Sequence, residues 1–168
     1  MLEKFTNISE NHTNLTEVDA IKVAQVLEAS PNEVYIFDQA TLTIEYANPR
    51  AARNLGYCLE ELQNMTILDI KTEFDITELN ELVTPLINHE VTQIHLETRH
   101  RRADGSSYPV EVYLQLVEEE ETLSFFAIVV DITKQKNAEQ SLQNKSQELA
   151  NVANNIPGAI YRLHYFQD

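Results

Sequence analysis

The sequence predicts an α+β fold in which helices pack against a small antiparallel sheet. Segments 33–38 and 123–132 are apolar at nearly every position, which is typical of central strands covered on both faces. Segments 92–98 and 108–116 alternate between apolar and polar residues on either side of a turn, as a hairpin with one buried face does. Residues at helical spacing fill the interval between the early and the late strands.

The helices follow from apolar spacing and from capping residues. Thr16 opens an amphipathic segment over 17–29, which ends at Ser30-Pro31. A second strand is predicted over 42–47. Helical character returns in 48–62, with Asn48 as cap and Pro49 at the first helical position. Short helical pieces continue to about Ile70, and a longer helix with one apolar face is predicted over 75–88.

A long helix is predicted after the last strand, over 134–154. Its seam positions are spaced 4, 3, 4, 3, 4 and comprise Ala138, Leu142, Lys145, Leu149, Val152 and Ile156. This is heptad spacing, and the remaining helix surface is strongly polar. We expect a coiled coil between chains, with packing of the helix on its own domain as the alternative.

The chain divides into five predicted parts. We expect a disordered tail over 1–15, a flanking helix over 16–30, a central domain over 31–133 and the coiled-coil helix over 134–154. The last part, 155–168, repeats the pattern Pro, aliphatic, Tyr that opens the central domain. We interpret it as the start of a second copy of that domain.

Charge and composition exclude several classes of function. The 168 residues carry a net charge of −15, which repels nucleic acid and anionic membrane surfaces. Hydrophobic residues make up 43% of the chain, as in globular proteins, and neither a signal sequence nor a membrane-spanning run is present in it. We expect a cytoplasmic protein without nucleic-acid or membrane partners.

No catalytic or metal-binding pattern stands out in the sequence. Cys58 is the single cysteine, and the three glycines are too far apart for a phosphate-binding loop. His95 and His100 are five positions apart on one predicted strand, so they face opposite sides and cannot share a metal ion. His95 is expected at the surface. His100 is either partly exposed near the hairpin end or a polar group of an interior pocket.

Five short motifs, in this order, resemble the PAS sensor domain family of the S-box and PAC type. They are Tyr46-Ala47-Asn48-Pro49, Leu55-Gly56-Tyr57, Leu59-Glu60-Glu61-Leu62, Arg102-Ala103-Asp104-Gly105-Ser106 and Asp131-Ile132-Thr133. Ala103 departs from the pattern, because family members usually carry a basic residue there. The resemblance spans about 30–135 and implies a five-stranded antiparallel sheet in the order 2-1-5-4-3, with helices over one face.

The resemblance also implies a ligand pocket between the sheet and the helices. The expected pocket residues are Tyr35, Phe37, Tyr57, Leu82, Leu86, Leu96, His100, Val112, Ala127 and Val129. Flavin-adduct members carry a cysteine where this chain has Ile67, and haem-binding members carry a histidine in the helix that 75–88 represents, which contains none. We therefore expect neither covalent flavin nor haem, and either an unknown small molecule or no cofactor. Non-covalent flavin adenine dinucleotide depends less on such motifs and stays open.

The function implied by this resemblance is that of a non-enzymatic sensory and dimerisation module near the start of a signalling protein such as a sensor histidine kinase. Asp131 and Thr133 join the last strand to the long helix and are the expected signal relay. The expected dimer and coil contacts are Phe126, Ile128, Val130, Leu142, Lys145, Leu149 and Val152. The alternatives are a ligand-free structural dimerisation domain and an input domain of a cyclic-dinucleotide synthase or hydrolase.

Overall fold

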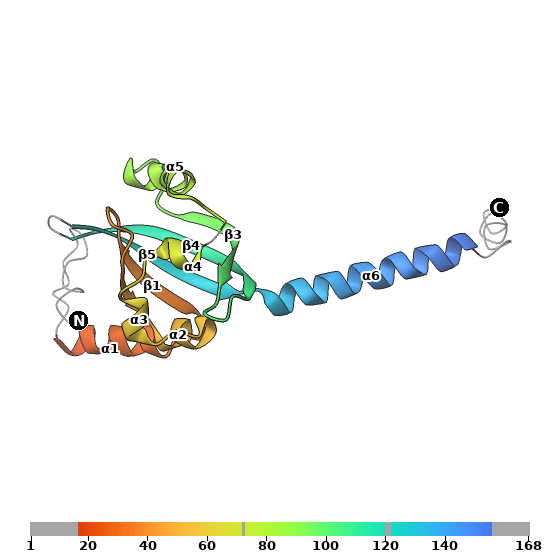
Figure 1. Ribbon diagram of the computed structural model, residues 1–168, viewed down its shortest axis with the longest axis horizontal. Coiled ribbons are helices and arrows are strands. Elements are labelled where there is room, and N and C mark those ends of the chain that lie inside the picture. Colours follow the sequence, from red (N-terminus) through yellow and green to blue (C-terminus); the bar gives the residue numbers. More distant parts are fainter. Residues whose placement is uncertain (1–16, 72, 120–121, 156–168) are drawn as a thin grey trace, which may run out of the picture. The chain divides into compact units, whose positions relative to one another are not determined.

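A computed structural model describes residues 17–71, 73–119 and 122–155 of the chain (Figure 1). The chain divides into two compact units, and the boundary in the sequence falls between Ile132 and Thr133. The predicted tail over 1–15 lies outside the described residues, and so does almost all of the predicted second domain over 155–168. Within the described segments, no helix has both the length and the apolar content needed to cross a membrane.

The first unit contains a five-stranded antiparallel sheet in the order β2-β1-β5-β4-β3, as expected. The strands are β1 (Glu33–Asp38), β2 (Ile44–Ala47), β3 (Ile94–Arg101), β4 (Ser107–Glu119) and β5 (Thr122–Asp131). β1 and β5, the two strands with continuous apolar sequence, pair at the centre of the sheet. Tyr35 faces Ala127 across this pair, and Ala127 faces Leu114 of β4. Side chains of these three residues therefore form one row on the inner face.

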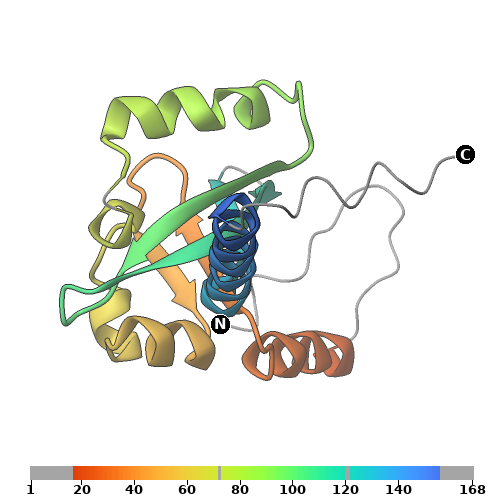
Figure 2. The same ribbon diagram turned by 90° about the vertical axis from the view of Figure 1, so that its right-hand side faces the viewer.

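The helices formed by the chain between β2 and β3 cover this inner face of the sheet (Figure 2). The helices of the first unit are α1 (Glu17–Glu28), α2 (Pro49–Leu55), α3 (Leu59–Leu62), α4 (Ile67–Ile70) and α5 (Ile76–Ile87). Apolar residues of α2 to α5 join the inner face in one hydrophobic cluster, which includes Leu55, Leu62, Ile70 and Leu86. Burial of this cluster is the main stabilising contribution to the unit.

Asn48 fixes the point where α1, β1 and α2 meet. Its side-chain oxygen accepts hydrogen bonds from the amides of Ala51 and Val34, at 3.0 and 3.1 Å. Its side-chain amide donates to the carbonyl oxygens of Leu27 and Asn32, both at 3.0 Å. The residue predicted as a helix cap therefore also ties two other elements together, and it is fully buried.

The predicted helix over 48–62 is two helices, because the backbone turns at Gly56. Gly56 has φ +79°, a left-handed conformation that ends α2 and that a side chain would strain. Cys58 then caps α3: its sulfur accepts from the amide of Glu61, whose carboxylate accepts from the amide of Cys58.

The second strand begins at Ile44, two residues later than predicted. Asp38 causes the delay, since its carboxylate accepts hydrogen bonds from the amides of Ala40 and Thr41 and closes a turn. Leu42 follows this turn with φ +60° and is buried, so it cannot continue a regular strand.

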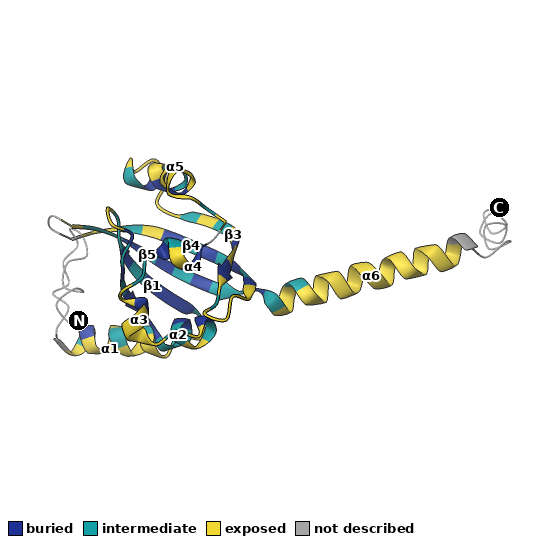
Figure 3. Ribbon diagram, viewed as in Figure 1, coloured by how far each residue is buried: buried dark blue, intermediate teal, exposed yellow. Residues whose placement is uncertain are grey.

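The outer face of the sheet is apolar along β5. Phe126, Ile128 and Val130 point away from the hydrophobic cluster and are half-buried, whereas their neighbours Phe125, Ala127 and Val129 are buried (Figure 3). The alternation predicted for the hairpin is also present: Thr98 and His100 are buried, while Glu97 and Arg99 are exposed.

The described part of the second unit is one helix, α6 (Thr133–Asn155). Its seam residues Leu142, Leu149 and Val152 are more than half exposed in the single chain. Lys145 is also exposed, and Ile156 lies outside the described residues. The apolar stripe of this helix therefore stays exposed among the described residues.

Candidate ligand-binding cavity

A small cavity lies between the inner face of the sheet, α4 and α5. Its volume is about 20 Å³, which is on the scale of an ordered water or a ligand of a few heavy atoms. The lining residues are Tyr35, Phe37, Ile67, Lys71, Leu79, His100, Val112, Leu114, Ala127 and Val129. The walls are mostly aliphatic and aromatic, and Lys71 and His100 are the basic side chains among them.

Six of the ten residues predicted for the pocket line this cavity: Tyr35, Phe37, His100, Val112, Ala127 and Val129. The other four lie elsewhere in the hydrophobic layer. Leu86 is buried in the core, and Tyr57, Leu82 and Leu96 are partly buried against it. Whether the lining residues bind a ligand stays a prediction.

Four lining residues were not in the predicted set. Leu79 and Leu114 belong to the apolar faces that the sequence does reveal, so their periodicity could have found them. Ile67 stands where the flavin-adduct members of the resembled family carry a cysteine. Lys71 gives no such signal, because a lysine between two helices is ordinarily a surface residue.

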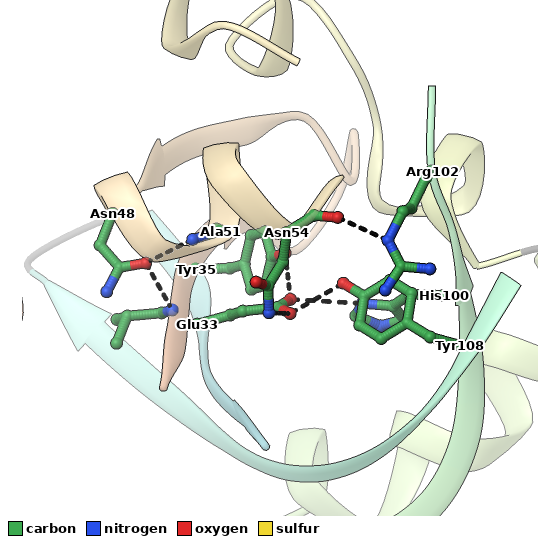
Figure 4. Close-up of polar contacts among 9 residues, drawn as sticks. Glu33, Tyr35, Asn48, Ala51, Asn54, His100, Arg102 and Tyr108 are labelled. Carbon is green, nitrogen blue, oxygen red and sulfur yellow. Dashed lines mark hydrogen bonds and ion pairs between the residues drawn. The ribbon is translucent and has the colours of Figure 1, made fainter. Parts of the chain in front are cut away.

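A buried carboxylate, Glu33, stands beside the cavity on β1 (Figure 4). Its two oxygens accept hydrogen bonds from the hydroxyls of Tyr35 and Tyr108, at 2.7 and 2.8 Å. The side-chain amide of Asn54 donates to the same carboxylate at 2.8 Å. Three donors therefore replace the water that the buried charge has lost.

Burial and the negative charge of Glu33 both keep the two tyrosines protonated. The pKa of Tyr35 is well above its usual value, chiefly because the hydroxyl is buried and then because Glu33 is close. The pKa of Tyr108 is raised for the same reasons in the same order. The guanidinium of Arg102 lies 3.9 Å from the centre of the Tyr108 ring, and its Nε donates to the carbonyl oxygen of Asn54.

His100 lies at the border between this network and the cavity. It is 1% exposed, so the interpretation of a partly exposed histidine is wrong. The strand pairing explains the difference, because His100 faces Tyr108 across the hairpin and both side chains point inward. Nδ1 lies 3.7 Å from Oε2 of Glu33, too far for a hydrogen bond. Burial lowers the pKa of His100, outweighing the opposite effect of Glu33, and this favours the neutral ring.

Lys71 brings a second basic group to the cavity. Only 5% of the residue is exposed, and its ammonium lies 4.9 Å from the centre of the Phe74 ring. Burial lowers the pKa of Lys71 to about 8, although the carboxylate of Glu73 acts in the opposite direction. A lysine at this position destabilises the folded chain whenever it is charged.

The stability of the protein is expected to depend on pH through Lys71. Since the folded pKa of about 8 is below the ordinary 10.5, the unfolded chain binds more protons between these values. The Lys71 contribution to the free energy of unfolding should therefore rise by roughly 2 kcal/mol from pH 8 to about pH 10. The buried tyrosines ionise in the unfolded chain around pH 10.0 and oppose the upper part of this rise. Urea denaturation of the parent chain and of Lys71→Met at the same pH values isolates the Lys71 contribution.

Lys71→Met should abolish this rise, because the unfolded and folded chains then differ no longer in proton binding at this site. Lys134→Met changes an exposed lysine of α6 and should leave the rise intact. An equal rise in Lys71→Met would contradict the assignment.

The other two histidines of the described residues, His89 and His95, and the cysteine lie outside the cavity. His95 is an outer-face residue, as predicted, with Nε2 at 2.7 Å from Glu111 and its ring stacked on Tyr113. His89 is exposed beyond the end of α5 and pairs with Glu118 at 3.2 Å. Cys58 is exposed at the start of α3. Among the described residues, no three histidine, cysteine or acidic side chains are grouped as metal ligands.

The predicted relay residues stand at a junction of the chain. Asp131 ends β5 and pairs with Val110 of β4, and Thr133 begins α6 two residues later. The intervening amide of Ile132 donates to the carbonyl oxygen of Pro109 at 3.2 Å. The end of β5 is thus held by the sheet up to the residue before the helix.

The strand order, with β1 and β5 at the centre, and the cavity under a helical layer place the domain in a class of small α+β domains. The sequence model of the PAS domain family matches residues 31–134, which is more than half of the chain. The chain belongs to the PAS domain family.

Solved structures show the same fold. The PAS domain of an HTR-like protein from Haloarcula marismortui is 28% identical, with a TM-score of 0.61 over 69% of this chain and 93% of that one. A PAS domain from a two-component sensor histidine kinase is 20% identical, with a TM-score of 0.59 over 68% and 97%. The PAS domain of nitrogen regulation protein NR(II) from Vibrio parahaemolyticus is 18% identical, with a TM-score of 0.55 over 66% and 97%. No curated protein matches the sequence.

Proposed function

We propose that this chain is a cytoplasmic PAS sensory and dimerisation module that passes changes in its cavity to α6 and onward to an output domain. The main observation in support is that β5 has cavity-lining residues on one face and an apolar surface on the other. Ala127 and Val129 line the cavity, while Phe126, Ile128 and Val130 present an apolar surface on the other face. A displacement of β5 therefore reaches both faces and the start of α6 along one strand.

We propose a histidine kinase as the output, in line with the likeness in fold to the PAS domain from a two-component sensor histidine kinase. The chain itself is proposed to be non-catalytic. The input domain of a cyclic-dinucleotide synthase or hydrolase would carry the same β5 and α6, so it remains a second candidate for the whole protein.

The relay is tested by distances between the two copies of α6 in the dimer. In a Cys58→Ser background with Gln143→Cys spin labels, Val129→Leu should overpack the cavity and change the distance between labels. Adding Asp131→Ala or Thr133→Ala should remove that change while circular dichroism shows a folded domain. Lys134→Ala, next to the relay on α6, is the matched control and should preserve the change.

If the distance changes equally with and without the relay substitutions, the strand does not pass the signal through Asp131 and Thr133. If Val129→Leu leaves the distance unchanged in a stable dimer, the module is a ligand-free dimerisation domain. That second function is favoured by the apolar outer face alone, since Phe126, Ile128 and Val130 need no ligand to pair.

The homodimer is proposed to pair α6 with a second copy of itself, because a heptad seam is complementary to the same seam in register. Lys145→Leu should then raise the melting temperature and shift dimers toward larger assemblies, since a lysine in the seam opposes both. Light scattering and thermal unfolding measure the two effects. Gln143→Leu, off the seam, should change neither, and no change in Lys145→Leu would mean that α6 does not form a coil.

A further inference from the structure

Lys71 carries a buried positive charge that forms no ion pair with any described residue, although the Glu73 carboxylate acts on it from a distance. Its ammonium makes no hydrogen bond in the described segments either and lies over the face of the Phe74 ring. Two acidic residues, Asp69 and Glu73, are two positions from Lys71 in sequence, and both are engaged elsewhere. The Glu73 carboxylate accepts from the Thr98 hydroxyl at 2.9 Å and from the Arg99 amide at 3.0 Å. The Asp69 carboxylate accepts from the amide and the hydroxyl of Thr66, at 2.8 and 2.9 Å. A buried lysine without an anion is an unfavourable arrangement.

His100 is a second polar residue of the same cavity that lacks a hydrogen-bond partner among the described residues. It is almost completely buried, and neither ring nitrogen makes a hydrogen bond within the described structure. Nδ1 is directed to the Glu33 side, where the carboxylate is already engaged by three donors. Nε2 is therefore the nitrogen that remains for a ligand, and in the neutral ring it can carry the hydrogen and donate.

The other residues that line the cavity limit the chemistry and the size of the rest of the ligand. The lining residues around Lys71 and His100 are apolar or aromatic, and they include Ile67, Leu79 and Val129. These walls favour a hydrocarbon part and give no further polar partner. The cavity of about 20 Å³ restricts the ligand to a few heavy atoms.

We infer that the cavity binds a small aliphatic monocarboxylate of the size of acetate. The carboxylate pairs with the Lys71 ammonium and accepts a hydrogen bond from Nε2 of His100, and the alkyl part contacts the apolar walls. This rests on the proposed sensory function and gives it a ligand class. The positive charge that attracts the carboxylate belongs to Lys71 alone, because the chain as a whole is strongly acidic.

Calorimetric titration of the full chain with acetate tests the inference, with ethanol and ethylammonium as neutral and cationic probes of similar size. We expect one carboxylate per chain and much weaker binding of the other two probes. Lys71→Met should weaken carboxylate binding roughly tenfold or more, which is the loss expected for a charged hydrogen bond. Because this change removes an unpaired buried charge, the variant should fold at least as stably.

His100→Leu should also weaken carboxylate binding, by a smaller factor than Lys71→Met, since it removes a neutral donor. The exposed control Lys134→Met should bind carboxylates like the parent chain. Equal binding of ethanol and acetate, or undiminished acetate binding by folded Lys71→Met, would overturn the inference.

The same samples separate this inference from the proposed function. Native mass spectrometry that finds another molecule bound, with no carboxylate binding, overturns the carboxylate assignment and leaves the sensory function in place. Acetate that binds through Lys71 without changing the distance between α6 labels supports the carboxylate site and overturns the relay.

Discussion

Glu33→Leu should lower the free energy of unfolding by about 3 kcal/mol. The substitution keeps the approximate volume of the side chain but removes the acceptor of two tyrosine hydroxyls. Tyr35 and Tyr108 are both buried, so each is left with an unmet donor. Urea denaturation followed by circular dichroism measures the loss.

A triple variant tests whether the unmet hydroxyls cause this loss of stability, because it removes the two hydroxyls as well as the carboxylate. Glu33→Leu combined with Tyr35→Phe and Tyr108→Phe should recover most of the lost stability, because removing both partners leaves no buried donor unmet. Glu81→Ala, an exposed position on α5, should change stability by less than about 0.5 kcal/mol. A triple variant less stable than Glu33→Leu would show that the hydroxyls do not depend on this carboxylate.

Asn48→Ala should also lower the free energy of unfolding by about 3 kcal/mol, through a different mechanism. It removes the cap of α2 and leaves the Val34 amide and the carbonyl oxygens of Leu27 and Asn32 without their partner. Since one of these carbonyl groups belongs to α1, hydrogen exchange in α1 should accelerate more than exchange in α5.

Asn48→Asp separates the role of the side-chain oxygen from the role of the side-chain NH₂ group. An aspartate keeps the acceptor for the Ala51 and Val34 amides but has no amide to donate to Leu27 and Asn32. It should preserve the α2 cap while releasing α1. Equal exchange rates for α1 in the parent chain and in both variants would contradict the account of Asn48 as a joint between elements.

The positions that follow a repeating pattern were predictable from the sequence. The continuous apolar runs identified β1 and β5 as the central strands, and alternation placed Thr98 and His100 on the inner side of β3. Six residues of the cavity wall followed from strand parity or from the family resemblance. Asn48 was found as a helix cap because capping has a local sequence signature.

Residues whose environment depends on distant segments were not predictable. The sequence near Glu33 gives no sign that Tyr108, which is 75 positions later, donates to its carboxylate. Lys71 is hydrophilic by residue type, and its burial results from the way α4, α5 and the sheet close around it. The split of the helix at Gly56 was missed because an isolated glycine is compatible with either a helix interior or a cap.

The sequence by itself determined the class of the fold, the central strands, the inner and outer faces of the sheet and the heptad seam, because periodicity and capping act over a few neighbouring residues. Only the tertiary structure decided that Glu33, His100 and Lys71 are buried around one small cavity. Such charged groups are placed by contacts between segments far apart in the chain. Their pairing depends on which side chains the completed fold brings within hydrogen-bond distance.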